Sequence, residues 1–327
     1  MQNTKRALAA LLTAGAILLT GCGSENARQI NRHRIVCSVF PEYDWTRQIL
    51  GSHTDDFELC YLLESGADPH SFQPSVEDMM KVADCDLFLY IGGESDAWTA
   101  DAIAEAVNPD MQTVALLDVL GGETVTEEVK EGMQAEDESE EAEDGEEAPE
   151  YDEHVWLSLR RAKTVCAEIT EKLCQIDRAN AADYRANLTA YTQKLDALDQ
   201  DFQALADSAS QKTLLFGDRF PFRYFTEDYG LDYYAAFVGC SAETEAAFET
   251  VVFLANKLDE LGLDTVYTIE SSDGSLARTI IENTKDKNQQ IAVLNSIQSV
   301  TAQQVADGTT YLSLMQQNYD VLKAHLK

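Results

Sequence analysis

The sequence predicts an α/β protein of two lobes, each a four-stranded, mostly parallel sheet flanked by helices, bridged by one long helix. Three observations predict this fold. Short apolar runs that favour strands alternate with helical patterns in both halves of the chain, as in parallel sheets with helical crossovers. An unusually long helical pattern interrupts this alternation once, near the middle. The chain has 327 residues, of which 45% are hydrophobic, enough for two separate cores.

Each half of the chain contains four strand candidates. Those of the first half are Arg34–Phe40, Phe57–Leu63, Leu87–Ile91 and Thr113–Leu117, with helical patterns at Tyr43–Leu50, Val76–Ala83 and Thr99–Ala106. Those of the second half are Thr213–Gly217, Asp232–Phe237, Thr265–Glu270 and Ile291–Asn295. Because strands separated by helices of this length pair in parallel, one sheet is expected in each half.

The long helical pattern lies between the halves. Asp177 is a suitable N-cap, and apolar residues recur after it at steps of three and four, from Tyr184 to Leu205. A helix over residues 178–208 would be roughly 45 Å long at the usual rise per residue. So short an apolar seam favours packing along both lobes over a coiled-coil partner. It predicts a stiff connection with little hinge opening.

The first 22 residues have the pattern of a secretory signal. Lys5 and Arg6 precede an apolar run over residues 7–20, which is too short to span a bilayer. The run ends in Leu-Thr-Gly-Cys22, which resembles the lipobox of bacterial lipoproteins and implies a lipid on Cys22. We therefore expect an extracytoplasmic protein anchored to the cell membrane by that lipid. The expected parts are a signal peptide (1–22), a polar leader (23–33), an N-terminal lobe (34–176), a linking helix (177–208) and a C-terminal lobe (209–327).

Charge and cysteines narrow the class of protein. The formal net charge of −34 argues against nucleic acid as a partner, because phosphates are bound by Lys and Arg. We expect a monomer. Besides Cys22 the chain has six cysteines and no CxxC pair, so buried free thiols are the preferred interpretation. A Cys37–Cys60 disulfide stays open in an oxidising compartment.

One acidic segment stands apart within the N-terminal lobe. Residues 127–153 contain 15 acidic residues and one basic residue, and Gly132, Gly145 and Pro149 interrupt any helix. Such a segment repels itself and buries little apolar surface, so we expect a disordered insertion. It is either a solvated loop or a weak collector of cations, and it leads directly into Asp152-Glu153-His154.

Two of the five histidines lie beside carboxylates at element junctions. His70 follows Asp68-Pro69 after the second strand candidate, and His154 follows Asp152-Glu153. Ligands of open α/β sheets bind at the carboxyl ends of strands, which makes His70 a candidate nitrogen ligand. Spacing alone does not make these two histidines a metal motif.

Five segments, in order over nearly the whole chain from Val36, resemble the zinc- and manganese-binding lipoproteins of bacterial ABC importers, the ZnuA/AdcA type. They are Gly66–Asp78 (GADPHSFQPSVED), Asp152–Leu157 (DEHVWL), Tyr184–Leu195 (YRANLTAYTQKL), Phe222–Leu231 (FRYFTEDYGL) and Glu270–Ser275 (ESSDGS). The resemblance implies a metal site between two lobes, with His70 and His154 as the first two ligands.

The third ligand departs from the pattern of this family. The family has His, or Glu in manganese members, five residues before the tyrosine that matches Tyr224, and that position is Arg219 here. A guanidinium has no lone pair to donate. The resemblance then implies Asp218 as the local substitute, or a site with three protein ligands. For the fourth ligand it implies a carboxylate, Glu270 or Asp273, although Asp218 and Asp273 are also suited to pairing or helix capping.

Two imidazoles with one or two carboxylates suit Zn²⁺, with Mn²⁺ as second choice because geometry decides between such ions. Zinc members of the family often carry a charged, His-rich loop before the second histidine. The acidic insertion here, which contains no histidine, favours zinc by analogy with that loop. The resemblance implies a solute-binding protein, not an enzyme, that captures zinc and delivers it to an ABC-type permease. A metallohydrolase and an adhesive surface lipoprotein are the alternatives from other classes. The chain has no HExxH motif, which weakens the hydrolase hypothesis.

Overall fold

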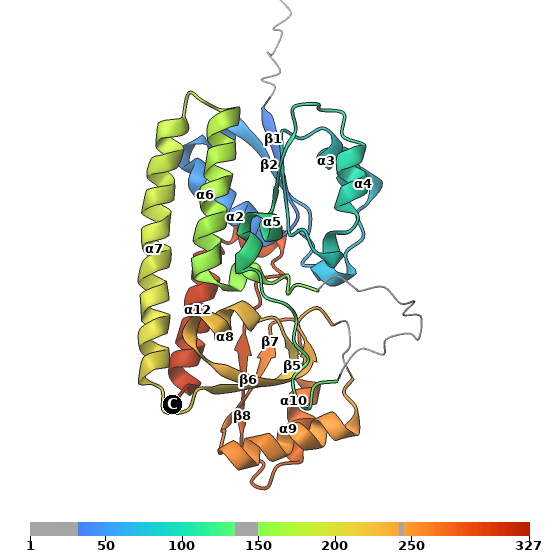
Figure 1. Cartoon of the computed structure of the whole chain (residues 1–327), viewed down its shortest axis with the longest axis vertical. Coiled ribbons are helices and arrows are strands. Elements are labelled where there is room, and N and C mark those ends of the chain that lie inside the picture. Colours follow the sequence, from blue (N-terminus) through green and yellow to red (C-terminus); the bar gives the residue numbers. More distant parts are fainter. Residues whose placement is uncertain (1–31, 135–149, 242–244) are drawn as a thin grey trace, which may run out of the picture. The chain divides into compact units, whose positions relative to one another are not determined.

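The computed structural model describes residues 32–134, 150–241 and 245–327 (Figure 1). Residues 33–327 form one compact unit. This unit contains two four-stranded sheets, and all strand pairs in both are parallel. The predicted two-lobe α/β fold is therefore confirmed.

The N-terminal sheet has the strand order β2-β1-β3-β4. Its strands are β1 (His33–Cys37), β2 (Phe57–Tyr61), β3 (Leu87–Tyr90) and β4 (Gln112–Ala115), and its helices are α2 (Phe40–Leu50), α3 (Val76–Ala83), α4 (Thr99–Ala104) and α5 (Leu116–Leu120). Strand β1 ends three residues earlier than predicted. The buried Glu42 carboxylate accepts hydrogen bonds from the backbone N–H groups of Ser38 and Val39 (2.8 and 3.2 Å), which starts α2 instead.

The C-terminal sheet has the equivalent order, β6-β5-β7-β8. Its strands are β5 (Thr213–Phe220), β6 (Asp232–Val238), β7 (Thr265–Ile269) and β8 (Gln290–Leu294). Its helices are α8 (Arg223–Tyr229), α9 (Phe248–Leu261), α10 (Ser275–Glu282), α11 (Ala302–Ala306) and α12 (Tyr311–His325). In both sheets the chain moves first to one side of the starting strand and then to the other. Ligand sites form at the carboxyl ends of strands at such switch points.

The linking helix α7 spans Ala181–Ser208 and packs against α6 (Leu159–Ile176), which the sequence analysis did not single out (Figure 1). Asp177 does not cap α7 as predicted. It follows the end of α6, where its carboxylate accepts hydrogen bonds from the Tyr184 hydroxyl (2.7 Å) and from the Ala179 N–H (3.1 Å). Residues 178–180 of the predicted helix thus belong to the four-residue connection between α6 and α7.

The two sheets share a continuous apolar core, which includes Leu89 of β3 and Phe216 of β5. Buried polar groups also join the lobes. Asp44 of α2 accepts a hydrogen bond from the backbone N–H of Tyr311 in α12 (2.9 Å), and the Tyr311 hydroxyl donates to the carbonyl of Trp156 (2.5 Å). These contacts tie α12 of the C-terminal lobe to α2 and to the segment that follows His154.

Cys37 and Cys60 are both free thiols. Cys37 pairs with Tyr61 in the sheet, and Cys60 pairs with Val36. Since successive side chains of a strand point to opposite faces, this one-residue offset puts the two thiols on opposite faces of the sheet. A disulfide between them does not fit this register.

The predicted signal peptide, the predicted lipidation site Cys22 and residues 135–149 of the acidic insertion lie outside the described residues. The two described ends of the insertion make backbone contacts. Thr126 forms a β-bridge with Tyr151, Glu127 N–H donates to Glu150 (3.0 Å), and Gln134 N–H donates to Ala236 (2.9 Å). Over the described ranges, none of the helices combines the length and the apolar character needed to cross a bilayer.

Candidate metal centre

His70 lies on a single 3₁₀ turn, Pro69–Ser71, beyond the carboxyl end of β2. Asp68 caps this turn, because its carboxylate accepts a hydrogen bond from the backbone N–H of His70 (3.0 Å). Pro69 fixes the first residue of the turn. The short motif therefore sets the direction of the His70 side chain, which is only 6% exposed.

His154 is fully buried and immediately precedes a second 3₁₀ turn, Val155–Leu157. The Asp152 carboxylate accepts from the backbone N–H of His154 (2.8 Å) and lies 3.1 Å from its Nδ1. The Trp156 ring packs edge-on against the imidazole, with centroids 5.3 Å apart. These contacts fix both the position and the orientation of the ring.

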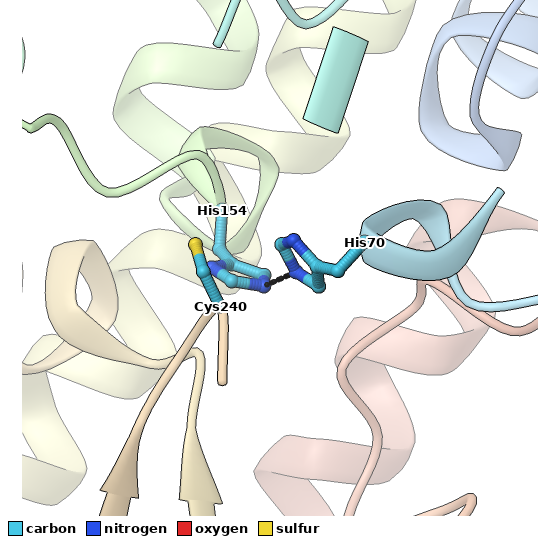
Figure 2. Close-up of side chains that lie close together, drawn as sticks. All are labelled: His70, His154 and Cys240. Carbon is cyan, nitrogen blue, oxygen red and sulfur yellow. Dashed lines mark hydrogen bonds between the residues drawn. The ribbon is translucent and has the colours of Figure 1, made fainter. Parts of the chain in front are cut away.

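The two imidazoles point their Nε2 atoms at each other, 3.0 Å apart (Figure 2). Two nitrogen ligands of a tetrahedral Zn²⁺ are separated by about 3.3 Å, given Zn–N bonds of about 2.0 Å. The histidine pair is thus within a few tenths of an ångström of the spacing that zinc requires.

The outer nitrogen of each ring faces an oxygen. Nδ1 of His154 faces Asp152, and Nδ1 of His70 lies 2.6 Å from Oγ of Ser95. Glu153 accepts a hydrogen bond from the Ser95 N–H through Oε1 (2.9 Å) and brings Oε2 to 3.7 Å from His70 Nδ1. Histidines that bind metals commonly have an oxygen partner at the other nitrogen, which fixes the tautomer and the ring orientation.

The surroundings shift the pKa values of the two histidines in opposite directions. Burial, with a smaller effect of the neighbouring His154, lowers the pKa of His70 to about 3. Burial also acts to lower the pKa of His154, but the nearby Asp152 carboxylate outweighs it and leaves that pKa above its ordinary value. At neutral pH His70 is therefore neutral.

A third potential donor comes from the C-terminal lobe. Cys240 follows the end of β6, and its Sγ, with one nitrogen of each histidine, forms a group of atoms that all lie within 4.8 Å of one another (Figure 2). Gly239 makes this approach feasible. A Cβ there would lie 3.0 Å from Cε1 of His154 and 2.9 Å from the carbonyl oxygen of Phe220.

Arg219 contacts both loops that carry the donors. Its guanidinium forms an ion pair with Asp68, two residues before His70, and donates to the carbonyl of Ser241, next to Cys240 (3.2 Å). Arg219 thus links the histidine turn of one lobe to the cysteine loop of the other.

The three carboxylates named as candidate ligands each accept hydrogen bonds in this structure, and two of them, Asp218 and Asp273, line the same cavity as His70. Asp218 accepts from the backbone N–H groups of Arg219 (2.9 Å) and Ile269 (3.2 Å). Glu270 accepts from the N–H and hydroxyl of Ser296 (2.7 and 2.8 Å), and Asp273 accepts from the N–H at the start of α10 (2.7 Å). In the part of the chain that is described, these carboxylates do not join the group of His70, His154 and Cys240.

Cys240 is the residue that the sequence analysis missed, because all six cysteines beyond Cys22 were interpreted as buried thiols. The sequence feature that could have identified Cys240 is its position in the chain. Gly239-Cys240 follows the strand that pairs with β5, so it lies at the same sheet edge as Arg219.

Residues 35–325 match the family model described as ZnuA, zinc-uptake complex component A, periplasmic. The chain belongs to the ZnuA family. It is 26% identical over 296 residues to the zinc-binding protein AdcA of Streptococcus pyogenes serotype M3, covering 89% of this chain and 55% of AdcA. It is 25% identical to the high-affinity zinc uptake system protein ZnuA of Bacillus subtilis, covering 97% and 96% of the two chains. The chain spans about half the length of the AdcA relatives it matches.

Solved structures of ZnuA-like proteins have the same fold. The Zn(II)-bound ZnuA-like domain of Streptococcus pneumoniae AdcA superposes with a TM-score of 0.69 at 24% identity, covering 90% of this chain and 99% of that domain. At this identity the likeness establishes the fold alone.

Proposed function

We propose that this protein is the extracytoplasmic metal-capture component of an ABC-type importer, which binds Zn²⁺ and delivers it to a membrane permease. Family membership and the printed names of the relatives support the proposal, since these are zinc-binding and zinc-uptake proteins. Lipidation of Cys22, which lies outside the described residues, would keep the captured ion beside the permease.

One observation carries the proposal: the facing pair of His70 and His154. Both rings come from short, capped turns, present Nε2 atoms 3.0 Å apart, and have an oxygen at the outer nitrogen. Two imidazoles held in advance of binding lose little freedom when an ion arrives, which favours tight binding. The nitrogen donors also favour Zn²⁺ over Mn²⁺, which prefers carboxylate and carbonyl oxygens.

The arrangement suits binding better than hydrolysis. A metallohydrolase activates water at an open coordination position with a general base beside it. The carboxylates nearest the pair, Asp152 and Glu153, instead face the outer nitrogens of the two rings. We therefore propose a carrier without catalytic turnover.

Direct titration tests this function. Zn²⁺ should bind the purified protein at one ion per chain and raise its melting temperature, since a ligand at 100 times Kd adds about 2.7 kcal/mol to stability. His70→Ala and His154→Ala should each weaken binding severely, with His53→Ala as the matched control because His53 pairs with Asp183 at the surface. The absence of a zinc-dependent shift in melting would overturn the proposal, as would turnover of ester or phosphoester substrates.

A further inference from the structure

We propose that the thiolate of Cys240 is the third protein ligand of the zinc ion, and that Arg219 positions the two ligand-bearing loops without touching the ion. This inference rests on the proposed function, because it concerns the same ion. It assigns the third donor to the cysteine after β6 in place of the family position at Arg219.

Potential donor atoms from three parts of the chain come together at one place. His70, His154 and Cys240 come from three separate segments, and one potential donor atom from each lies within 4.8 Å of the other two. Figure 2 shows the sulfur of Cys240 beside the ring of His154. Among the described cysteines, no other joins such a group. The remaining thiols, at Cys37, Cys60, Cys85, Cys166 and Cys174, belong to or pack against the apolar core.

The backbone directly before Cys240 packs closely against its neighbours. Gly239 lies against the imidazole of His154 and the carbonyl of Phe220, at distances that leave no room for a Cβ. Glycine at this position lets the segment that carries the thiol lie against the His154 ring.

The order of the strands places Cys240 next to Arg219. Strands β5 and β6 are parallel neighbours with Phe220 paired to Val238, so Arg219 and Cys240 lie at the same edge of the sheet. The β6 loop can therefore supply a donor to the same ion that a residue at the end of β5 would reach.

Arg219 holds the two ligand-bearing loops in place. Its planar guanidinium binds Asp68 on one side and the Ser241 carbonyl on the other. Asp68 in turn caps the turn of His70. An arginine fork can hold two acceptors in fixed geometry, which a single lysine charge cannot. Arg219 is accordingly a positioning residue that sets the distance between His70 and Cys240.

The chemistry of the donor set follows. When zinc binds, the S–H bond of Cys240 breaks, a Zn–S bond forms, and the proton leaves to solvent. Two imidazoles and a thiolate form a softer set than the histidine and carboxylate set of the sequence-based hypothesis. Thiolate ligands select zinc strongly against manganese.

Cobalt spectroscopy tests the thiolate directly. Co²⁺ bound to the wild-type protein should show the near-ultraviolet charge-transfer band of a sulfur ligand. Cys240→Ser and Cys240→Ala should lose this band and weaken zinc binding by more than about 100-fold, since even an outer partner of a ligand is worth 10–100-fold. Cys60→Ser is the matched control, because it removes a half-buried thiol outside the donor group and should keep both band and affinity.

Alkylation gives a second readout that does not depend on the variants folding. In the wild-type protein, zinc should protect Cys240 from iodoacetamide, as measured by mass spectrometry of the peptide that contains it. The rate at Cys60 should be the same with and without zinc.

The outcomes separate the two proposals. If zinc does not bind the wild-type protein at all, the proposed function itself fails. If zinc binds, but the cobalt band is absent and Cys240 is alkylated equally in both states, the function stands and the thiolate assignment is overturned.

Arg219→Gln tests the positioning role. It should weaken zinc binding while the cobalt band persists, since the thiolate remains available but its loop is no longer held. Arg219→Lys should recover little of the affinity, because it restores the charge without the fork. Unchanged affinity in Arg219→Gln would contradict the positioning role. Loss of the band at saturating cobalt would also contradict it, because the thiolate would then need Arg219 in order to bind the metal at all.

Discussion

The Glu153 carboxylate faces His70 from the side opposite His154, with Oε2 3.7 Å from Nδ1. Glu153 is buried, and within the described chain its Oε2 has no hydrogen-bond partner. Gly93 permits this position, because a Cβ there would lie 2.2 Å from Oε1. The carboxylate is thus held close to His70 Nδ1, whose nearer hydrogen-bond partner is Ser95 Oγ at 2.6 Å.

Glu153→Gln should therefore weaken zinc binding by about 10–100-fold, the usual loss when the oxygen partner of a metal-bound histidine is changed. The amide of Gln removes the negative charge that stabilises a zinc-bound imidazole. Competition with a chelator of known affinity measures the effect. Glu77→Gln, on the exposed face of α3, is the control, and an equal loss in both variants would contradict this role of Glu153.

Gly239→Ala should also weaken zinc binding, by pushing the Cys240 loop away from His154. The added Cβ would meet Phe220 and the His154 ring at about the limit of tolerated contacts, and overpacking of this kind typically costs about 1–3 kcal/mol. Gly122→Ala is a matched control, because a Cβ there has nothing within 4 Å. The zinc affinities of both variants would be measured by titration, and equal affinities would refute this role of Gly239.

Asp218→Asn separates the carboxylate hypothesis from the thiolate. Both oxygens of Asp218 accept backbone hydrogen bonds, from Arg219 and Ile269. We expect a loss of stability of about 1 kcal/mol, typical of a hydrogen bond, with zinc affinity unchanged. Chemical denaturation and zinc titration measure the two quantities. A large loss of affinity at normal stability would instead identify Asp218 as a ligand.

Asp96 should make stability depend on pH. Burial raises its pKa to about 7, against the effect of hydrogen bonds from the N–H groups of Ile91 and Gly92. Since the folded-state pKa lies above the unfolded value of 3.8, the folded state holds the proton more tightly, and stability falls as the pH rises from about 4 to about 7.

Asp96→Asn should remove this contribution to the pH dependence, up to roughly 4 kcal/mol at 1.36 kcal/mol per pKa unit. Relative to the wild type, the variant should therefore gain stability at pH 8 compared with pH 5. Urea denaturation at the two pH values measures the difference. An identical pH dependence in both proteins would show that Asp96 does not titrate in this range.

The alternation of strands and helices was enough to predict both sheets, because parallel strands need helical crossovers of recognisable length. Element ends were less predictable. The sequence pattern around Ser38 and Val39 continues a strand, and only the buried Glu42 carboxylate ends it there. The start of α7 was displaced for a similar reason, since Asp177 binds the Tyr184 hydroxyl instead of capping the helix.

The candidate site, too, was predictable only in part. Resemblance led to His70 and His154, and the structure places them face to face. The remaining donors depend on which side chains the sheet edge brings together, and that is a long-range property. Nothing local to Cys240 distinguishes it from a core thiol. The contact between Gly239 and His154, two residues 85 positions apart, is what marks it.

The shared strand order of the two sheets bears on how related sequences are compared. Neighbouring parallel strands end at the same edge of a sheet, so the end of either strand can supply a ligand to a site at that edge. A comparison confined to the aligned column of Arg219 would classify this chain as having lost a ligand and hence its cargo. Surveys of metal carriers should therefore score donors over adjoining strand ends together, and chains with a basic residue in that column should be searched for a Gly-Cys pair after the neighbouring strand.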